Sequence, residues 1–530
     1  MSEVCDAVVV GAGPNGLVAA AALADAGWDV LLLEEQPQVG GAVRSAEVIA
    51  PGFVTDLFSA FYPLAAASPV IRDLDLGSHG LVWRRSPDVL AHAFPDGRVA
   101  VLRDRAEDTA AGLEECAAGD GEAWMRMVEG WSRIRDPLLD ALFTPLPAAG
   151  PVTRILRRTG VSGAFDLMRL ALMPVRRLGE EEFGSEEARV LFSGNAMHSD
   201  IPPTGAGSAL FGWLLAMLGQ DVGFPVPEGG AGALATSLRR RAESSGARVE
   251  CGVAVTGIDV SGGRARAVRF ADGRVVRARR AVLADVPAPV LFGGLVAADR
   301  LPPRLRQDIA RFDWDDATLK VNWALERPIP WRGAGAKGAG TVHLGVDDDG
   351  LVDVAADLAV GRMPGRPFLL LGQMTTADPT RSPAGTESAW AYTHLPRRHA
   401  ADEDAVAALA QRVDEAIEEV APGFGEAVIG RHVQTPLGLQ DANASLSLGA
   451  LNAGTAGLHQ QLVLRPTRGL GRPETPIPGL YLAGASAHPG GGVHGACGWN
   501  AAVSAMRRHG PRGAARRALV RTAWARVLRD

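Results

Sequence analysis

The stretch Ala7-Val8-Val9-Val10-Gly11-Ala12-Gly13-Pro14-Asn15-Gly16, near the start of the chain, joins an apolar run to three glycines in a GxGxxG pattern. The apolar run predicts a strand, and the alanine-rich segment 17–26 predicts a helix. In such a unit Gly11 allows a tight turn, Gly13 lets the backbone approach a pyrophosphate, and Gly16 lets the helix pack closely on the strand. The helix N-terminus presents unpaired N–H groups and a positive dipole end to phosphates. The sequence therefore predicts a dinucleotide site.

A second apolar run, 30–33, is followed by Glu34 and Glu35. Glu34 comes 18 residues after Gly16, at the end of the predicted second strand, where an acidic side chain accepts hydrogen bonds from ribose hydroxyls. A negative charge there disfavours a 2′-phosphate, so we do not expect NADP at this site.

A second glycine pair, Gly40-Gly41, follows shortly after, with Ala42 and Arg44 beside it. Such a pair lets the chain pass close to the diphosphate and ribityl region of a cofactor. An NAD domain has no need of this second turn, so we expect FAD.

Near the other end of the chain a predicted strand, 479–483, runs into Gly484, Ala485 and the glycine turn 488–493. This arrangement brings a late strand back to the same cofactor. We expect Gly484, Ala485, Gly491, Gly492 and Val493 to contact FAD, together with Val253, which lies where such domains pass the adenine. A predicted helix, 499–508, would point its N-terminus at the isoalloxazine C2 oxygen.

Length and composition bound the class of protein. A chain of 530 residues needs two or more domains, and a net charge of −6 shows no basic bias toward nucleic acid. The four cysteines are scattered without a CxxC pair, which argues against a redox-active dithiol and suits the cytoplasm. The apolar runs are too short to span a membrane, and we expect no metal site.

We expect an α/β fold, with a discontinuous Rossmann-like FAD-binding domain formed by 1–80, 225–290 and 466–510. An α+β substrate domain, 81–224 and 291–465, would be inserted between its parts. Within these domains the pattern predicts helical structure over 185–219, with a proline turn after His198, and separate short strands at 274–277 and 281–284.

Two segments are both basic and apolar. The first lies in the predicted helical part 134–180, where residues 150–178 hold six arginines and a single acid, Asp166. The second is a predicted basic C-terminal helix, 511–530. Either segment suits an anionic membrane surface, and the alternatives are a helix pair that roofs a substrate pocket and a terminal helix packed on the body.

The chain resembles the phytoene desaturase-like flavoproteins of the amine oxidase and carotenoid desaturase superfamily. The resemblance rests on four segments spread along the chain, 6–44, 224–234, 318–325 and 478–497. It implies an FAD-dependent oxidoreductase and says less about the substrate. One departure is His494, which follows Val493 where carotenoid desaturases tend to have proline; it counts against a polyene and adds a titratable group near the expected flavin edge.

Four residues are candidates for acid–base or oxygen chemistry at the flavin. His488 matches the His-Pro-Gly turn of the family, with a turn-stabilising imidazole as the alternative. His494 lies in the same glycine loop and could act as acid or base. Lys320 is a lone lysine in an apolar run, where burial is costly without a task or partner. His198 precedes a proline turn and would either line the pocket or be structural.

The favoured function is a dehydrogenase, desaturase or isomerase that acts on C–C bonds of a largely apolar isoprenoid, polyene or polyketide-derived substrate. Electrons would leave to oxygen, a quinone or NAD(P). One alternative is an amine oxidase in which Lys320 activates oxygen through a water; only three tyrosines are available for its aromatic cage. The others are an NAD(P)H-linked reductase and a non-catalytic, flavin-bound assembly subunit. Oligomeric state stays open.

Overall fold

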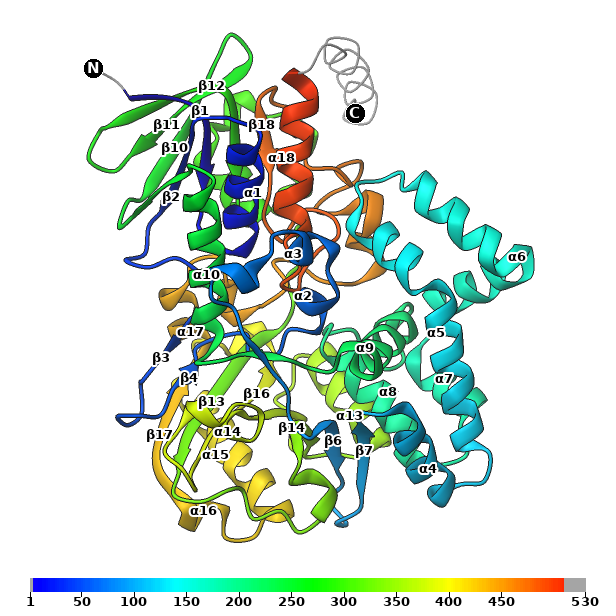
Figure 1. Ribbon diagram of the computed structural model, residues 1–530. Helices are drawn as coiled ribbons and strands as arrows, with labels where there is room; N and C mark the ends of the chain where they lie inside the picture. Colours follow the sequence, from blue (N-terminus) through cyan, green and yellow to red (C-terminus); the bar gives the residue numbers. More distant parts are fainter. Residues whose placement is uncertain (1–2, 510–530) are drawn as a thin grey trace.

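The computed structural model describes residues 3–509, so the predicted C-terminal helix 511–530 lies outside the described residues. Two seven-stranded sheets organise this part of the chain, with a helical lobe at their side (Figure 1). The predicted α/β class is confirmed.

The first sheet has the strand order β10-β11-β12-β1-β2-β9, with β18 paired to β12. Its strands are β1 (Glu3–Val10), β2 (Val30–Glu34), β9 (Arg248–Cys251), β10 (Val255–Ser261), β11 (Arg264–Phe270), β12 (Val275–Ala284) and β18 (Leu480–Leu482). Strands β9, β2, β1, β12 and β18 run parallel, and β10, β11 and β12 form an antiparallel meander. The two short strands expected at 274–277 and 281–284 are one strand, β12. It belongs both to the parallel part of the sheet and to the antiparallel meander.

Three helices lie together along this sheet: α1 (Pro14–Asp25), α10 (Ala231–Ser244) and α18 (Ala496–His509) (Figure 1). Residues 15–24 of α1 are all buried, and half of them are alanine. Small side chains let the helices approach closely, and a Cβ on Gly498 of α18 would overlap the Asn15 carbonyl oxygen of α1.

The second sheet has the order β17-β13-β16-β15-β14-β6-β7 and is antiparallel except where β6 pairs with β14. Its strands are β6 (Asp88–Ala93), β7 (Val99–Arg103), β13 (Ala317–Leu325), β14 (Ala339–Leu344), β15 (Leu369–Gln373), β16 (Glu387–Leu395) and β17 (Val428–Gln434). Helix α15 (Glu403–Val420) buries Leu409, Val413 and Ile417 in the core of this sheet, beside Val321 and Trp323.

The helical lobe lies between β7 and β8. Its helices are α4 (Ala106–Cys116), α5 (Asp120–Phe143), α6 (Ala149–Leu172), α7 (Val175–Glu182), α8 (Glu186–Met197) and α9 (Ser208–Val222). The region expected to be helical over 185–219 forms α8 and α9, and the proline turn expected after His198 separates them at residues 198–207, which contain Pro202 and Pro203. Helix α6 is kinked at Gly160 and projects from the lobe (Figure 1).

Short elements connect these parts. They are β3 (Ser45–Ala46), β4 (Thr55–Asp56), α2 (Pro63–Ala67), α3 (Pro69–Asp73), β5 (Trp83–Arg84), β8 (Val226–Pro227), α11 (Ala288–Val290), α12 (Pro303–Ala310), α13 (Asp348–Ala359), α14 (Met374–Ala377), α16 (Phe424–Ala427) and α17 (Pro436–Ala442). None of the helices within residues 3–509 combines the length and the hydropathy of a membrane-spanning segment.

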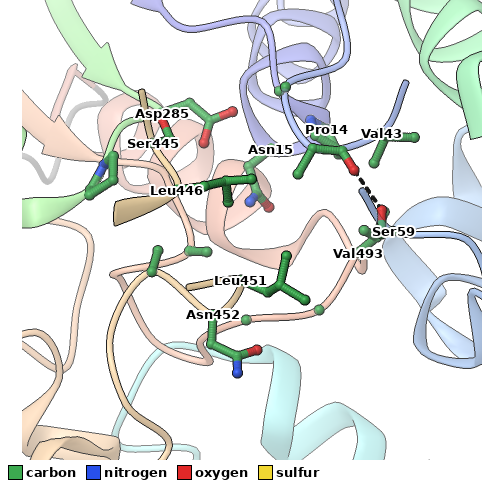
Figure 2. Close-up of a pocket in the computed structure, with 18 of the residues that line it drawn as sticks. Pro14, Asn15, Val43, Ser59, Asp285, Ser445, Leu446, Leu451, Asn452 and Val493 are labelled. Carbon is green, nitrogen blue, oxygen red and sulfur yellow. Dashed lines mark hydrogen bonds between the residues drawn. The ribbon is translucent and has the colours of Figure 1, made fainter. Parts of the chain in front are cut away.

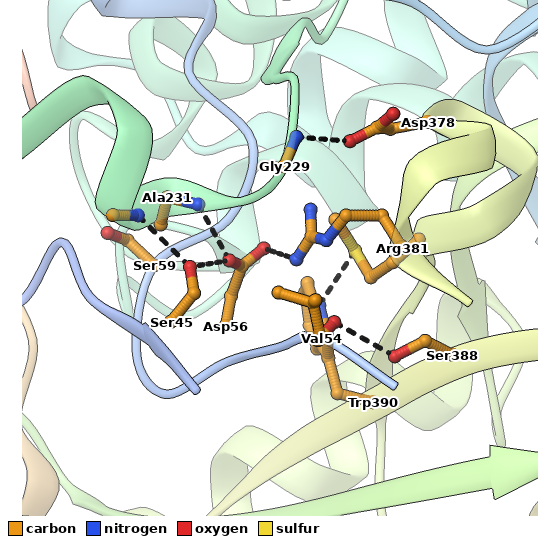
Figure 3. A network of polar contacts seen from close by, with 12 residues as sticks. Ser45, Val54, Asp56, Ser59, Gly229, Ala231, Asp378, Arg381, Ser388 and Trp390 are labelled. Carbon is orange, nitrogen blue, oxygen red and sulfur yellow. Dashed lines mark hydrogen bonds and ion pairs between the residues drawn. The ribbon is translucent and has the colours of Figure 1, made fainter. Parts of the chain in front are cut away.

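A buried ion pair joins the two sheet regions. Asp56, at the end of β4, accepts hydrogen bonds from Ser45 Oγ (2.7 Å) and from the Ala231 N–H at the start of α10 (2.8 Å). Its other oxygen lies 2.6 Å from a guanidinium nitrogen of Arg381, and both side chains are fully buried (Figure 3). The pair thus connects α10, beside the first sheet, to the segment between β15 and β16 of the second.

Candidate cofactor and substrate site

A cavity of about 470 Å³ is lined by residues of the first sheet and its loops, by the helical lobe and by the segment 443–465 that follows the second sheet. At one end are the carboxyl ends of β1, β2 and β12, the first turn of α1 and residues 41–44. The other lining comes from α5 and α9 and from the segments 59–64, 443–465 and 485–494. Figure 2 shows Pro14 and Asn15 facing the same space as Leu446 and Asn452.

The glycine turn after β1 is packed so tightly that each glycine is sterically required. Gly11 has φ +95°, and a Cβ on it would lie 2.5 Å from the Asp285 carbonyl oxygen. A Cβ on Gly13 would lie 2.7 Å from Asp285 Oδ2, and one on Gly16 would overlap the Gly11 carbonyl oxygen. Gly11 and Gly13 line the cavity with Pro14 and Asn15, whereas Gly16 packs behind them.

The Asn15 side chain supports the fit of this turn to a bound cofactor. Asn15 is 7% exposed, and among the described residues its Oδ1 has no hydrogen-bond partner. A buried amide oxygen without a partner is costly, and a bound group that donates a hydrogen bond would relieve that cost.

Asp285 is a site residue that the sequence analysis missed. It follows β12, lines the cavity, and its Oδ2 accepts a hydrogen bond from the Gly16 N–H at 2.7 Å. Burial raises the pKa of this carboxyl to about 7, against the opposing effect of the Gly16 hydrogen bond. The available signal was an acidic residue directly after the apolar run 281–284, at the end of a parallel strand.

The Glu34 carboxylate is placed to accept hydrogen bonds from ribose hydroxyls. It is 7% exposed; its Oε2 accepts from the Ala12 N–H (2.7 Å) and its Oε1 from the Gln36 N–H (3.0 Å). Each carboxylate oxygen keeps a further lone pair for a hydroxyl donor. Burial raises the pKa of Glu34. Glu35 and Val253 line the same end of the cavity.

The second glycine turn lies against the first. A Cβ on Gly41, whose φ is +55°, would lie 3.2 Å from Gly13 Cα. Gly41, Ala42 and Arg44 line the cavity, whereas Gly40 does not. The Arg44 guanidinium donates hydrogen bonds to the Gly41 carbonyl (3.0 Å) and to the carbonyl of Ala442, at the end of α17 (2.6 Å). The two turns therefore form one surface suited to a diphosphate.

The late glycine loop also reaches the cavity. Ala485, Gly491, Gly492 and Val493 line it. Gly484 does not; a Cβ on it would lie 2.9 Å from the Val286 carbonyl oxygen, so its task is close packing after β18. Turns from residues 11–16, 41–44 and 485–494 thus line one cavity, as the binding of FAD requires.

His494 and His488 differ in their placement. His494 lines the cavity, but its Nδ1 accepts the Ala496 N–H (3.0 Å) and its Nε2 lies 3.3 Å from the Gly490 carbonyl oxygen. Both nitrogens are engaged by the backbone of the loop, which does not favour the predicted acid–base role. His488 is buried away from the cavity lining. Burial lowers the pKa of each imidazole to about 4.

Lys320 is not among the cavity-lining residues. Its ammonium, on β13, donates to the Asp56 carbonyl (2.7 Å) and to Asn322 Oδ1, and it lies 5.3 Å from the centre of the Trp390 ring. Burial lowers its pKa to about 7. The expected cost of a buried lysine is therefore offset by partners within the junction of the two sheets, and the structure does not bring Lys320 together with the other candidates.

His198 lines the cavity at the turn after α8. Its Nε2 lies 2.9 Å from Nε2 of His343 on β14. Burial lowers the pKa of His198 to about 4, with an opposing contribution from the charge of Asp200.

One part of the lining is strongly apolar and was not predicted. It is formed by Phe61, Leu64, Leu142, Phe143, Phe211, Leu214, Leu215 and Phe224. Sequence patterns mark these residues only as core positions, because an apolar side chain that faces a cavity looks the same as one that faces another side chain. Asn452 and Arg465 on the segment 443–465 were also missed, and no motif marks them.

The comparisons with known proteins agree with this geometry. A model of the family described as flavin containing amine oxidoreductase matches residues 15–504. The chain is 30% identical over 550 residues to pyridine nucleotide-disulfide oxidoreductase domain-containing protein 2 of Rattus norvegicus, covering 95% of this chain and 93% of that protein. It is 30% identical over 511 residues to a hydroxyneurosporene desaturase of Cereibacter sphaeroides, covering 92% and 94%.

Among solved structures, an oxidoreductase from Methanosarcina mazei has a TM-score of 0.63 at 15% identity, covering 94% of this chain and 99% of that one. The fold and the glycine turns define an FAD-dependent oxidoreductase with a Rossmann-like cofactor domain and a substrate domain. The chain belongs to the flavin containing amine oxidoreductase family, within the predicted superfamily of amine oxidases and carotenoid desaturases.

Proposed function

We propose that the protein is an FAD-dependent dehydrogenase, desaturase or isomerase for C–C bonds of a largely apolar isoprenoid, polyene or polyketide-derived substrate. The observation that carries this is the apolar lining between α5, α9 and residues 61–64. Bound FAD would supply the redox chemistry of a desaturation, in which the substrate loses two hydrogens, with oxygen, a quinone or NAD(P) as the final electron acceptor. The desaturase named among the relatives supports a C–C reaction.

The distribution of charge in the cavity disfavours an amine substrate. The carboxylates that line it in the described residues are Glu34, Glu35 and Asp285, all at the nucleotide end. Tyr62 is the one tyrosine that residues 3–509 contribute to the lining, and its hydroxyl is hydrogen-bonded to Ser59. A tyrosine cage and an acidic partner for an ammonium group are both missing from the described lining, and Lys320 lies outside it.

The visible spectrum of the purified protein tests this proposal. We expect the spectrum of an oxidised flavin, and acid should release this flavin from the protein. Under anaerobic conditions, isoprenoid or polyene substrates should bleach the flavin absorbance. Bleaching by amines alone would replace the proposal with the amine oxidase. Bleaching by NADH or NADPH, followed by reduction of an unsaturated substrate, would establish the reductase. A flavin that no compound reduces would favour the non-catalytic subunit.

We also propose that α6 contacts an anionic membrane surface from the cytoplasmic side. Along this helix the apolar side chains Val152, Leu156, Val161, Phe165, Met168 and Leu172 are exposed, Val161 to 72%. On each side of the Gly160 kink they recur every three or four residues, which places them on one face. Exposed Arg157 and Arg158, which have no carboxylate partner among the described residues, supply positive charge that an anionic surface attracts. The exposed Arg154 and Arg169 are paired with Asp140 and Glu181.

The position of α6 relates this surface to the substrate. Helix α6 packs against α5, whose Leu142 and Phe143 line the cavity. A substrate dissolved in a bilayer would therefore meet the apolar part of the cavity close to the contact surface.

Flotation with vesicles of phosphatidylcholine and phosphatidylglycerol tests this contact. The protein should float with the anionic vesicles, and a Phe165→Ser/Met168→Ser variant should lose most of this binding because burial of apolar area drives insertion. Ile429→Ser, which removes an equally exposed apolar side chain on β17, is the matched control and should float normally. Equal flotation of both variants would refute the contact through α6.

A further inference from the structure

Two buried histidines form a direct pair at the wall of the cavity. His198 follows α8 and lines the cavity, and its Nε2 lies 2.9 Å from Nε2 of His343 on β14. His343 is fully buried. A hydrogen bond between two imidazole nitrogens needs one donor and one acceptor, so the pair has two alternative proton arrangements.

The surroundings of His343 decide between them. In the described part of the chain its Nδ1 is buried without a hydrogen-bond partner, and it faces Gly194 so closely that a Cβ there would overlap it. A proton on this Nδ1 would be a buried N–H without an acceptor, which is rarer and more costly than an unused lone pair. His343 therefore carries its proton on Nε2 and donates it to His198.

The groups around the pair leave both imidazoles neutral. His92 lies on the far side of His343, with ring centres 6.2 Å apart, and its Nε2 is engaged with the Val346 carbonyl. Asp200, the nearby carboxylate, is paired with His394 at 2.8 Å instead. Burial keeps the pKa of His343 well below its usual value.

These constraints define what His198 offers to the cavity. Since its Nε2 accepts from His343, its own proton is on Nδ1. Among the described residues this Nδ1 has no partner from the protein, while the side chain lines the cavity beside Phe224. A fixed N–H donor in a mostly apolar wall can form a hydrogen bond with an acceptor atom of a ligand. A hydrocarbon has no acceptor and gains no affinity from this N–H.

We infer that His343 is a positioning residue that holds His198 with its proton on Nδ1, so that the cavity selects an apolar substrate bearing one oxygen acceptor, such as a carbonyl, hydroxyl or ether. This inference rests on the proposed function and narrows its substrate class from hydrocarbons to oxygen-bearing compounds.

The proton position is tested without any substrate, by NMR of protein labelled with ¹⁵N-histidine. The His198 signal, assigned by its loss in His198→Phe, should show the Nδ1–H tautomer. It should change to a tautomer mixture in His343→Leu. His343→Gln, whose amide N–H can donate from a similar place, should restore the Nδ1–H form. An Nε2–H tautomer of His198 in the unchanged protein would overturn the inference.

The substrate preference is tested by titrating ligands into the oxidised holoenzyme. The change in flavin absorbance measures how tightly each ligand binds. Carvone and limonene share a carbon skeleton and differ by the ketone oxygen. The holoenzyme should bind carvone at least about tenfold more tightly than limonene. The His343→Leu variant should lose most of this preference, and His343→Gln should keep it, with thermal melts showing that both are folded.

Equal affinities in the unchanged enzyme, or no binding of either compound, would overturn the substrate selection. A failure of the proposed function has a different signature, because bleaching by amines alone would leave the NMR result unaffected.

Discussion

The Asp285 carboxyl binds the glycine turn of the cofactor site and also has a raised pKa. It lies at the end of β12 and accepts the Gly16 N–H of α1 at 2.7 Å. The position favours an acceptor, since the first turn of a helix has N–H groups without intrahelical partners. It disfavours a charge, because the group is buried, and burial raises its pKa to about 7.

We therefore predict that Asp285 makes folding stability depend on pH. Its pKa is 3.8 unfolded and about 7 folded, so the folded state binds the proton more tightly. The stabilisation is complete below about pH 4 and is lost as the pH rises to about 7, a change of about 4 kcal/mol. Asp285→Asn keeps an acceptor for Gly16 and should flatten this part of the profile.

Urea unfolding at saturating FAD, from about pH 4 to about pH 8, measures the effect. Asp299→Asn, at an exposed site, is the matched control and should leave the profile unchanged. If Asp285→Asn has the same pH profile as the unchanged protein, the assignment to Asp285 is wrong.

At the scale of elements, the contact between α1 and α18 holds the two ends of the chain together at the cofactor. Gly498 lies where the backbones of the two helices meet, and any side chain there would overlap the Asn15 carbonyl oxygen. Asn15 itself lines the cavity. A shift of α18 would therefore move α1 and the glycine loop 491–494, which leads directly into α18.

We predict that Gly498→Ala loses FAD and is destabilised by about 1–3 kcal/mol, because overpacking forces backbone shifts. The flavin content after purification and the melting temperature measure the two effects. Gly130→Ala is the matched control: it lies within α5 and a Cβ there meets open space. It should keep its FAD and be as stable or slightly more stable, as alanine favours helices. Retention of FAD by Gly498→Ala would contradict the close contact.

At the scale of the whole molecule, the buried pair of Asp56 and Arg381 connects the cofactor side to the second sheet (Figure 3). Asp56 also accepts the Ala231 N–H of α10, and its carbonyl accepts from Lys320 on β13. Residues 59–64, which follow Asp56 closely in the chain, contribute to the cavity lining, so the shape of the cavity depends on the junction.

We predict that Arg381→Met costs about 3–5 kcal/mol of folding stability, since it leaves the Asp56 carboxylate buried without its cation. The double variant Asp56→Asn/Arg381→Met should recover part of that loss, because the buried Asp56 carboxylate is then removed together with its cation. Denaturant unfolding measures both. Arg274→Met, at the exposed pair with Asp272, is the control and should unfold like the unchanged protein. A double variant less stable than Arg381→Met would argue against the charge explanation.

Local patterns determined much of the cofactor side. The turn 11–16, Glu34, the pair Gly40-Gly41 and the loop 488–493 were recognisable because backbone turns and close approaches impose residue types at short, fixed spacings. The α/β class and FAD follow from those spacings. The same dependence on local pattern explains the error at 274–284, where two apolar runs with arginines between them predict two strands. The structure has one strand there, because its two ends belong to the antiparallel and the parallel parts of the same sheet.

Only the tertiary structure decided which side chains face the cavity. Asn452 and the apolar lining come from segments far apart in the chain, and nothing local marks them as cavity residues. Asp285 had one local signal, its place directly after the apolar run 281–284. Lys320 and His198 looked alike in the sequence as buried polar groups near the cofactor. Folding gave Lys320 partners at the sheet junction and gave His198 a place at the cavity wall, because a buried polar group takes its role from the partners that long-range contacts bring to it.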